Sequence, residues 1–303
     1  MPDIVNDGVD IWDGLSFTML GMERHIANEG DIIRTGVSWC EMRVTPELLD
    51  LVSRARENEG VLRKSIGDPE IIVRTLVTEG VDAAEALAAD ASLPTEKLFD
   101  YCFSLKGRPL DQAPSRRNMR ERIRVWRHLN QSETSIPGSV DELFSLWEEA
   151  VAGEYPVYRE STTARFRTGI PFVEHIGAPK ATIVPPKKET VAPADIAKET
   201  SALLDFMQRT DIELELHTAA VVFAFLYIHP FRDGNGHTHR MLACSMLSQR
   251  YSAVTLVAFV RARQAVRWEE CKLIEGIVQD REDFGPYARF MLEKLCEAQE
   301  SLM

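Results

Sequence analysis

A short loop between two apolar runs constrains the fold of this chain more than any other part of its sequence. Residues 214–228 are almost continuously apolar, which predicts a buried helix. Pro230 should end this helix, because the residue before a proline avoids helical backbone angles, and His229 is then left at the exit. The next residues, Asp233 to Gly236, read DGNG and predict a tight turn with positive φ angles.

The residues that follow this turn predict a binding site for an anion. Apolar residues at helical spacing over 241–247 indicate a second helix that begins near Asn235 or Gly236. The free N–H groups of such a helix start point at one spot and favour an anion such as phosphate. His237 and Arg240 are three residues apart, so they share one face of the first turn and can reach the same phosphate chain.

Two further side chains of the loop suit reactions of phosphates. Asp233 is placed to hold a hard cation such as Mg²⁺, which binds through carboxylate and phosphate oxygens. His229 can accept a proton from an attacking hydroxyl, because the unperturbed pKa of histidine lies near neutrality.

Two other interpretations of the loop stay open at this point. A DGNG turn is also typical of a simple connection between two core helices. A zinc site formed by His229, His237 and His239 is the second alternative. It is disfavoured, because residues two apart on a helix point to different sides.

Composition narrows the class of protein. The chain has 303 residues, 45% of them hydrophobic, which is enough for one or two domains with a sizeable core. Its net charge of −12 argues against nucleic acid and membrane surfaces as partners. The apolar stretch 219–228 is too short to span a bilayer, and the acidic start of the chain lacks the pattern of a signal peptide. Five scattered cysteines without CxxC spacing predict buried thiols and a cytoplasmic location.

Local signals predict helices over most of the chain. Thr45 followed by Pro46 is typical of a helix start. Ser139 and Glu142 form a capping box at the start of another helix. Residues 166–176 and 181–184 are short apolar or β-branched pieces separated by glycine and proline, and they predict a small hairpin.

A loop over residues 135–138 separates two predicted parts of the chain. Residues 1–137 are expected to form an N-terminal helical region, and residues 138–303 a core that contains the hairpin and the DGNG loop. The sequence therefore predicts a mainly α fold.

The DGNG loop with its flanks resembles the signature of the Fic family, HxFx(D/E)GNxRxxR. The matching residues are His229, Phe231, Asp233, Gly234, Asn235, Gly236 and Arg240. The resemblance implies a Fic-type helical core with a small β-hairpin flap. It also implies a protein adenylyltransferase, an enzyme that moves AMP from ATP to a hydroxyl side chain of a target protein.

The resemblance assigns a role to each matching residue of the loop. His229 would be the general base, Asp233 would bind Mg²⁺, and Arg240 would hold the γ-phosphate. Gly234, Asn235 and Gly236 would form the nest for the phosphates. The implied partners are ATP and an unknown target protein, and the resemblance leaves open whether two copies pair as a homodimer.

One position departs from the family signature, because His237 stands where the family has its first arginine. Arginine offers phosphate a planar fork of donors, whereas histidine offers at most two and is only partly charged near pH 7. Alternatives are therefore a non-catalytic or weakly active regulatory module, or a member that removes AMP or transfers another phosphate-containing group. We favour an active enzyme, because His229, Asp233 and Arg240 all remain.

Two further segments resemble parts of the family, the first a flap and the second an inhibitory helix. Residues 181–186 resemble the flap that docks the target chain by strand-like pairing, which assigns this role to Thr182, Ile183 and Val184.

An inhibitory helix of the family has the pattern (S/T)xxxE(G/N). Residues 75–80 fit it with Glu79, in a helix expected near 72–80, and residues 53–58 fit it with Glu57. We prefer Glu79, because Glu57 lies in a charged run. A carboxylate paired with Arg240 would occupy the cation and repel a triphosphate.

Overall fold

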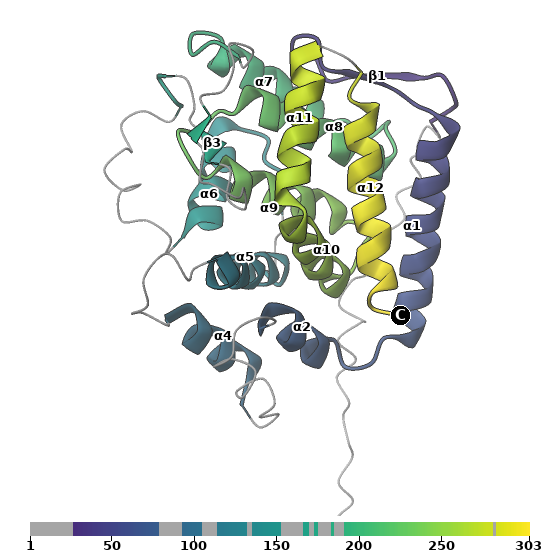
Figure 1. Ribbon diagram of the computed structural model, residues 1–303, viewed down its shortest axis with the longest axis vertical. Coiled ribbons are helices and arrows are strands. Elements are labelled where there is room, and N and C mark those ends of the chain that lie inside the picture. The colour runs from purple at the N-terminus through teal and green to yellow at the C-terminus, as the bar shows by residue number, and fades with distance from the viewer. Residues whose placement is uncertain are drawn as a thin grey trace, which may run out of the picture.

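Helices build most of the computed structural model (Figure 1). The structure describes residues 27–78, 93–104, 114–131, 135–152, 166–169, 173–174, 183–184, 191–280 and 283–303. The prediction of a mainly α fold with a small hairpin is confirmed. No helix within these ranges is both long and apolar enough to cross a membrane.

The first half of the chain contains the hairpin β1–β2 and five helices that the structure describes. Their bounds are β1 Ile32–Arg34, β2 Glu41–Arg43, α1 Pro46–Ser65, α2 Pro69–Thr78, α4 Thr95–Ser104, α5 Pro114–Leu129 and α6 Val140–Val151. The sequence analysis missed β1–β2. Its strands have three residues each, and only Ile33 and Met42, which face each other across the antiparallel pair, are buried. Such a short alternation is too weak a pattern to predict a strand.

The second half contains the predicted hairpin and a set of helices. Their bounds are β3 Val173–Glu174, β4 Ile183–Val184, α7 Ile196–Met207, α8 Leu214–Ile228, α9 Asn235–Leu247, α10 Ala253–Ala265, α11 Arg267–Asp280 and α12 Gly285–Glu300. Strands β3 and β4 pair antiparallel, with Val173 opposite Val184 and Glu174 opposite Ile183.

Helix α8 lies at the centre of the bundle. Every residue in it except Leu226 is buried, and it packs against α7, α9 and α12. On the side of α12, the ring of Phe223 stacks on that of Phe284 at 4.9 Å between centroids. A helix that is apolar all round is stable only when it is enclosed on all sides. The loop from α8 to α9 therefore starts in the interior of the protein.

Helix α5 is tied to α2 and α6 through buried arginine side chains. Arg124 donates to the carbonyls of Ala150 (3.0 Å) and Ala152 (2.9 Å), where α6 ends. Arg122 donates to the carbonyl of Leu76 in the last turn of α2. Carbonyls at helix ends lack partners within their own helix, so these bonds satisfy groups that burial would otherwise destabilise. In Figure 1, α5 lies between the pair α2–α4 and the layer of α9 and α10.

The predicted helix starts are present. The hydroxyl of Thr45 accepts a bond from Leu48 N–H at 3.4 Å, and that of Ser139 accepts one from Glu142 N–H at 3.2 Å. The carboxylate of Glu142 in turn accepts from the N–H of Gly138 at 2.6 Å. Free thiols are found at four described cysteines, of which Cys40, Cys244 and Cys296 are buried and Cys271 is half-buried.

Candidate functional site

The backbone of His229 is strained where α8 ends. This residue is the C-cap of the helix, with φ 50° and ψ 58°, in the left-handed region that non-glycine residues rarely adopt. Such a conformation persists when neighbouring groups hold it in place.

Arg167 is the group that holds this helix end. Its own N–H donates to the carbonyl of Pro230 at 2.9 Å, which ties the two chain segments together. Its buried guanidinium donates to the carbonyls of His229 (2.8 Å), Ile228 (3.1 Å), Val191 (2.6 Å) and Gly169 (2.8 Å). The sequence analysis assigned Arg167 no role, because nothing in the sequence places it beside His229.

The imidazole of His229 is held in its neutral form. Burial, together with the positive charge of Arg167, lowers the pKa of His229 to about 4. A neutral imidazole has a lone pair free to accept a proton near pH 7. His229 can therefore act as a general base.

The turn after His229 is packed so tightly that one position requires glycine. Gly234 has φ 81°, and a Cβ added to it would lie 2.5 Å from Cγ1 of Val151 and 2.8 Å from Nε1 of Trp147. The same indole N–H donates to the carbonyl of Asp233 at 2.8 Å. Helix α6 thus fixes the outer side of the turn.

Asn235 fixes the inner side of the turn. Its side chain accepts a bond from the N–H of Phe231 at 3.0 Å and donates one to the carbonyl of the same residue at 2.7 Å. The ring of Phe231 packs on Trp147 at 5.4 Å between centroids. The N–H groups of Asn235 and Gly236, at the start of α9, have no acceptor among the described residues. The nest for an anion is therefore made by backbone, while the amide of Asn235 shapes the loop.

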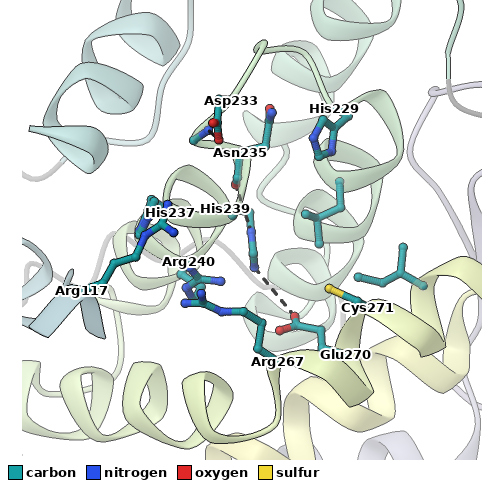
Figure 2. Close-up of a pocket in the computed structure, with 14 residues that line it drawn as sticks. Arg117, His229, Asp233, Asn235, His237, His239, Arg240, Arg267, Glu270 and Cys271 are labelled. Atoms are coloured by element: carbon teal, nitrogen blue, oxygen red, sulfur yellow. Dashed lines mark hydrogen bonds and ion pairs between the residues drawn. The ribbon is translucent and has the colours of Figure 1, made fainter. Parts of the chain in front are cut away.

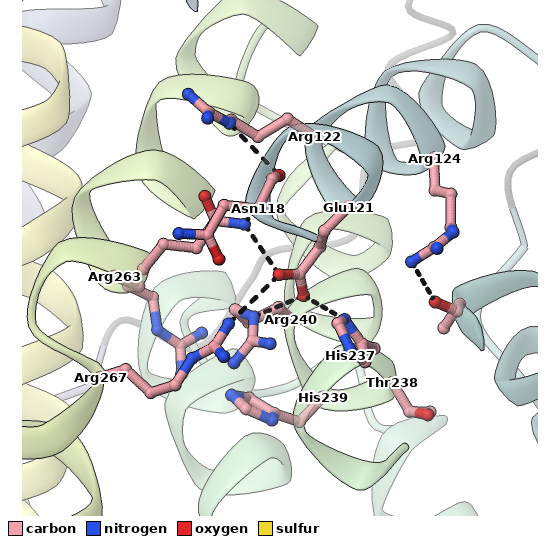
Figure 3. A network of polar contacts seen from close by, with 12 residues as sticks. Asn118, Glu121, Arg122, Arg124, His237, Thr238, His239, Arg240, Arg263 and Arg267 are labelled. Atoms are coloured by element: carbon pink, nitrogen blue, oxygen red, sulfur yellow. Dashed lines mark hydrogen bonds and ion pairs between the residues drawn. The ribbon is translucent and has the colours of Figure 1, made fainter. Parts of the chain in front are cut away.

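A buried carboxylate from α5 contacts both Arg240 and His237 of α9 (Figure 3). Glu121 Oε1 lies 2.6 Å from Arg240 Nε and 3.0 Å from His237 Nδ1. Its Oε2 accepts from Gln264 Nε2 at 2.7 Å and lies 3.5 Å from Arg267 Nη2. Burial opposes the charge of Glu121, but Arg240, His237 and Arg267 together hold its pKa well below the usual 4.5.

One pocket is lined both by the loop between α8 and α9 and by Arg240 (Figure 2). The residues proposed from the sequence that line it are His229, Asp233, Gly234, Asn235, Gly236, His237 and Arg240. Its volume of about 180 Å³ is below the roughly 300–1,000 Å³ of typical small-molecule sites. The pocket as it stands has room for a small anion.

The proposed zinc site is not formed. No group of three or more histidine, cysteine, aspartate or glutamate side chains in the described ranges is arranged around a common point for a metal. His239 Nδ1 lies 3.0 Å from the carbonyl of Asn235, and its Nε2 lies 3.8 Å from Glu270 Oε1. The carboxylate of Asp233 is exposed beside the loop and accepts from Gly234 N–H at 2.6 Å.

The remaining candidate residues are not among those that line the pocket in the described part of the chain. Glu79 and Thr182 fall outside the described residues, and of Ile183 and Val184 the structure describes the backbone of β4. Glu57 is exposed on α1, a helix that packs against α12. Among the residues that the structure describes, the carboxylate that meets Arg240 is Glu121, which no pattern marked. Arg117 precedes it by four residues where the inhibitory pattern requires serine or threonine.

Comparisons with known proteins identify the region around this pocket. Residues 139–247 match the family model described as the Fic/DOC family. The crystal structure of a Fic family protein from Desulfovibrio desulfuricans G20 has a similar fold, with a TM-score of 0.58. That similarity covers 85% of this chain and 74% of the other chain at 17% sequence identity, so it concerns the fold alone. No curated protein matches the sequence.

Gly234→Ala should destabilise the protein. The left-handed backbone costs alanine about 1–2 kcal/mol, and the overlap with Val151 and Trp147 adds about 1–3 kcal/mol. Urea unfolding of both proteins measures the difference.

Gly236→Ala is the matched control, because its new Cβ would meet Arg240 at an ordinary 3.7 Å within helix α9. We expect no loss of stability for it. Equal effects of the two substitutions would contradict the packing described for the turn.

His229 should titrate well below an ordinary histidine. NMR of the imidazole as a function of pH should give a midpoint near 4, against 6.5 for the unfolded chain. The folded protein binds this proton more weakly than the unfolded chain does. The contribution of His229 to stability is therefore complete above pH 6.5 and is lost as the pH falls toward the folded pKa. A midpoint near 6.5 in the folded protein would contradict the buried, Arg167-facing environment.

Proposed function

We propose that this chain, whose residues 139–247 match the model of the Fic/DOC family, is a protein adenylyltransferase. Members of the family generally transfer nucleotides or other phosphate-containing groups to proteins. The observation that carries the proposal is the single pocket shared by His229, the start of α9 and Arg240. It combines a proton acceptor, a backbone anion nest and a cation, which are the parts needed for transfer of a phosphate group.

The proposed reaction assigns a step to each of these groups. His229 accepts the proton of a target hydroxyl, whose oxygen bonds to the α-phosphorus of ATP. The bond from that phosphorus to the bridging oxygen breaks, and pyrophosphate leaves. The N–H groups of Asn235 and Gly236 and the guanidinium of Arg240 stabilise the charge on the phosphates.

A magnesium ion fits this pocket. Asp233 offers one exposed carboxylate beside the phosphate nest, and Mg²⁺ commonly binds through one or two carboxylates together with substrate phosphates and water. Asp233 would hold the ion. When bound, the ion would neutralise part of the charge on the phosphates.

The hairpin β3–β4 is the proposed docking flap for the target chain. Two-stranded antiparallel pairs leave backbone N–H and C=O groups on their outer edges, where an extended peptide can pair. This role applies to residues 182–184, and a target bound there would present its hydroxyl to His229.

We propose further that Glu121 restrains the reaction. It occupies Arg240 and His237 at 2.6 and 3.0 Å, the two side chains that a phosphate chain would contact on α9. A carboxylate and a phosphate compete for the same cations and repel each other. Glu79 stays a prediction for the same role.

Labelled ATP tests the proposed activity. With ATP labelled at the α-phosphate, the wild-type protein should label itself or proteins of a lysate, and His229→Ala should reduce the label at least a hundredfold, in the range typical of general-base removal. ATP labelled at the γ-phosphate is the control and should leave no label. Label from the γ-position would point to phosphorylation, and no label from either would favour a non-catalytic module.

Glu121→Gln should raise AMP transfer about tenfold or more, because the neutral amide pairs more weakly with Arg240 than a carboxylate does. Glu79→Gly tests the alternative brake under the same conditions, and the exposed Glu57→Gln serves as the control. Activation by Glu79→Gly without activation by Glu121→Gln would remove Glu121 from this role.

A further inference from the structure

Besides Arg240, the guanidiniums of Arg117 and Arg267 line the pocket, from outside the loop and both of its helices. Arg267 is the first residue of α11 and lines the same pocket as His229 and Arg240. Figure 2 shows its side chain reaching from α11 toward that of Arg240. The guanidiniums of Arg240 and Arg267 therefore come from separate helices, α9 and α11, to one end of the pocket.

Arg267 is poorly satisfied by the protein itself. Its side chain is 18% exposed, and its Nη2 lies 3.5 Å from Glu121 Oε2, whereas Arg240 takes the short 2.6 Å contact with the same carboxylate. Neither its Nε nor its Nη2 finds a hydrogen-bond acceptor within the described ranges. Burial, followed by the charge of Arg240, lowers the pKa of Arg267 to about 10. A cation in the first turn of a helix is also unfavourable, because that end carries the positive part of the helix dipole.

The charges around Arg267 leave an excess of positive charge. The single negative charge of Glu121 faces two guanidiniums, those of Arg240 and Arg267. Arg117 adds further positive charge near Arg267, whereas Arg263 is paired with Glu270. An anion that entered the pocket would supply both the missing charge and the missing acceptors.

We propose that Arg267 is a phosphate-binding residue that holds the terminal phosphates of ATP together with Arg240. It supplies the second guanidinium that the loop lacks, because position 237 is a histidine in contact with Glu121. This inference rests on the proposed function for the identity of the ligand. The arrangement of charges favours binding of a polyphosphate whether or not that ligand is ATP.

A binding role and a structural role predict different effects on stability. A structural arginine destabilises the fold when it is removed, whereas a buried charge with unmade hydrogen bonds does not stabilise it. Arg267→Gln should therefore unfold at the same temperature as the wild type or at a higher one. A lower melting temperature would favour a structural role.

Calorimetric titration tests the binding role directly, in the wild type and in Glu121→Gln, with Mg²⁺ present. The probes are ATP, inorganic tripolyphosphate and AMP. Arg267→Gln should weaken ATP and tripolyphosphate about tenfold to a hundredfold, the range of one charged hydrogen-bonding contact, and should change AMP less than about twofold. Arg267→Lys keeps the charge without the planar fork and should recover part of the affinity. Lys272→Gln is the matched control, because Lys272 is exposed on the same helix, over the ring of Trp268.

The outcomes separate this inference from the proposed function. Equal affinity of Arg267→Gln and the wild type for tripolyphosphate overturns the role of Arg267 and leaves AMP transfer standing. Binding of tripolyphosphate that depends on Arg267, without AMP transfer, supports Arg267 and overturns the proposed function. Absence of polyphosphate binding in every variant overturns both.

Discussion

The carboxylate of Glu121 and the guanidinium of Arg240 meet at 2.6 Å in the interior of the bundle, and both side chains are almost fully buried. Two charges removed from water are costly unless each is paired and hydrogen-bonded, so α5 and α9 hold each other in one register. The same pair sets the chemistry of the pocket, because it decides whether Arg240 faces a protein carboxylate or a bound anion. Helix α5 also carries the arginines that donate hydrogen bonds to the ends of α2 and α6. A movement of α5 that displaced Glu121 would therefore disturb its contacts with α2, α6 and α9. The contact that shapes the pocket is thus also part of the core.

The loop beside this pair is rigid for several independent reasons. Arg167 holds the strained backbone of His229, the indole of Trp147 holds the carbonyl of Asp233, and Asn235 bonds both backbone groups of Phe231. Each bond fixes a different point of the turn. A site that transfers a group gains from such preorganisation, because no free energy is then spent on ordering the loop when the ligand binds. The same bonds also explain why the amide of Asn235 is not available to a ligand.

The electrostatics of the pocket run against those of the whole protein. The chain has a net charge of −12, yet Arg240 and Arg267 share the single charge of Glu121 at one end of the pocket. A recessed region of positive charge in an acidic surface concentrates anions locally, while the surface as a whole repels larger polyanions. Such a distribution favours small anions over large ones.

Local patterns in the sequence determined the parts of this protein that depend on neighbours along the chain. The mainly α fold, the caps at Thr45 and Ser139, the end of α8 before Pro230 and the short hairpin all follow from periodicity, capping and turn residues. The motif also placed His229 and Arg240 on the two sides of one short loop, close enough to share a pocket. Tertiary structure alone decided which residues from distant segments meet them. Glu121 and Arg267 lie 119 and 27 residues from Arg240 along the chain, and Arg167 lies 62 residues from His229. An isolated arginine or glutamate on a helix has the same local signal whether it faces water or an ion pair, so its partner is set by how the helices pack.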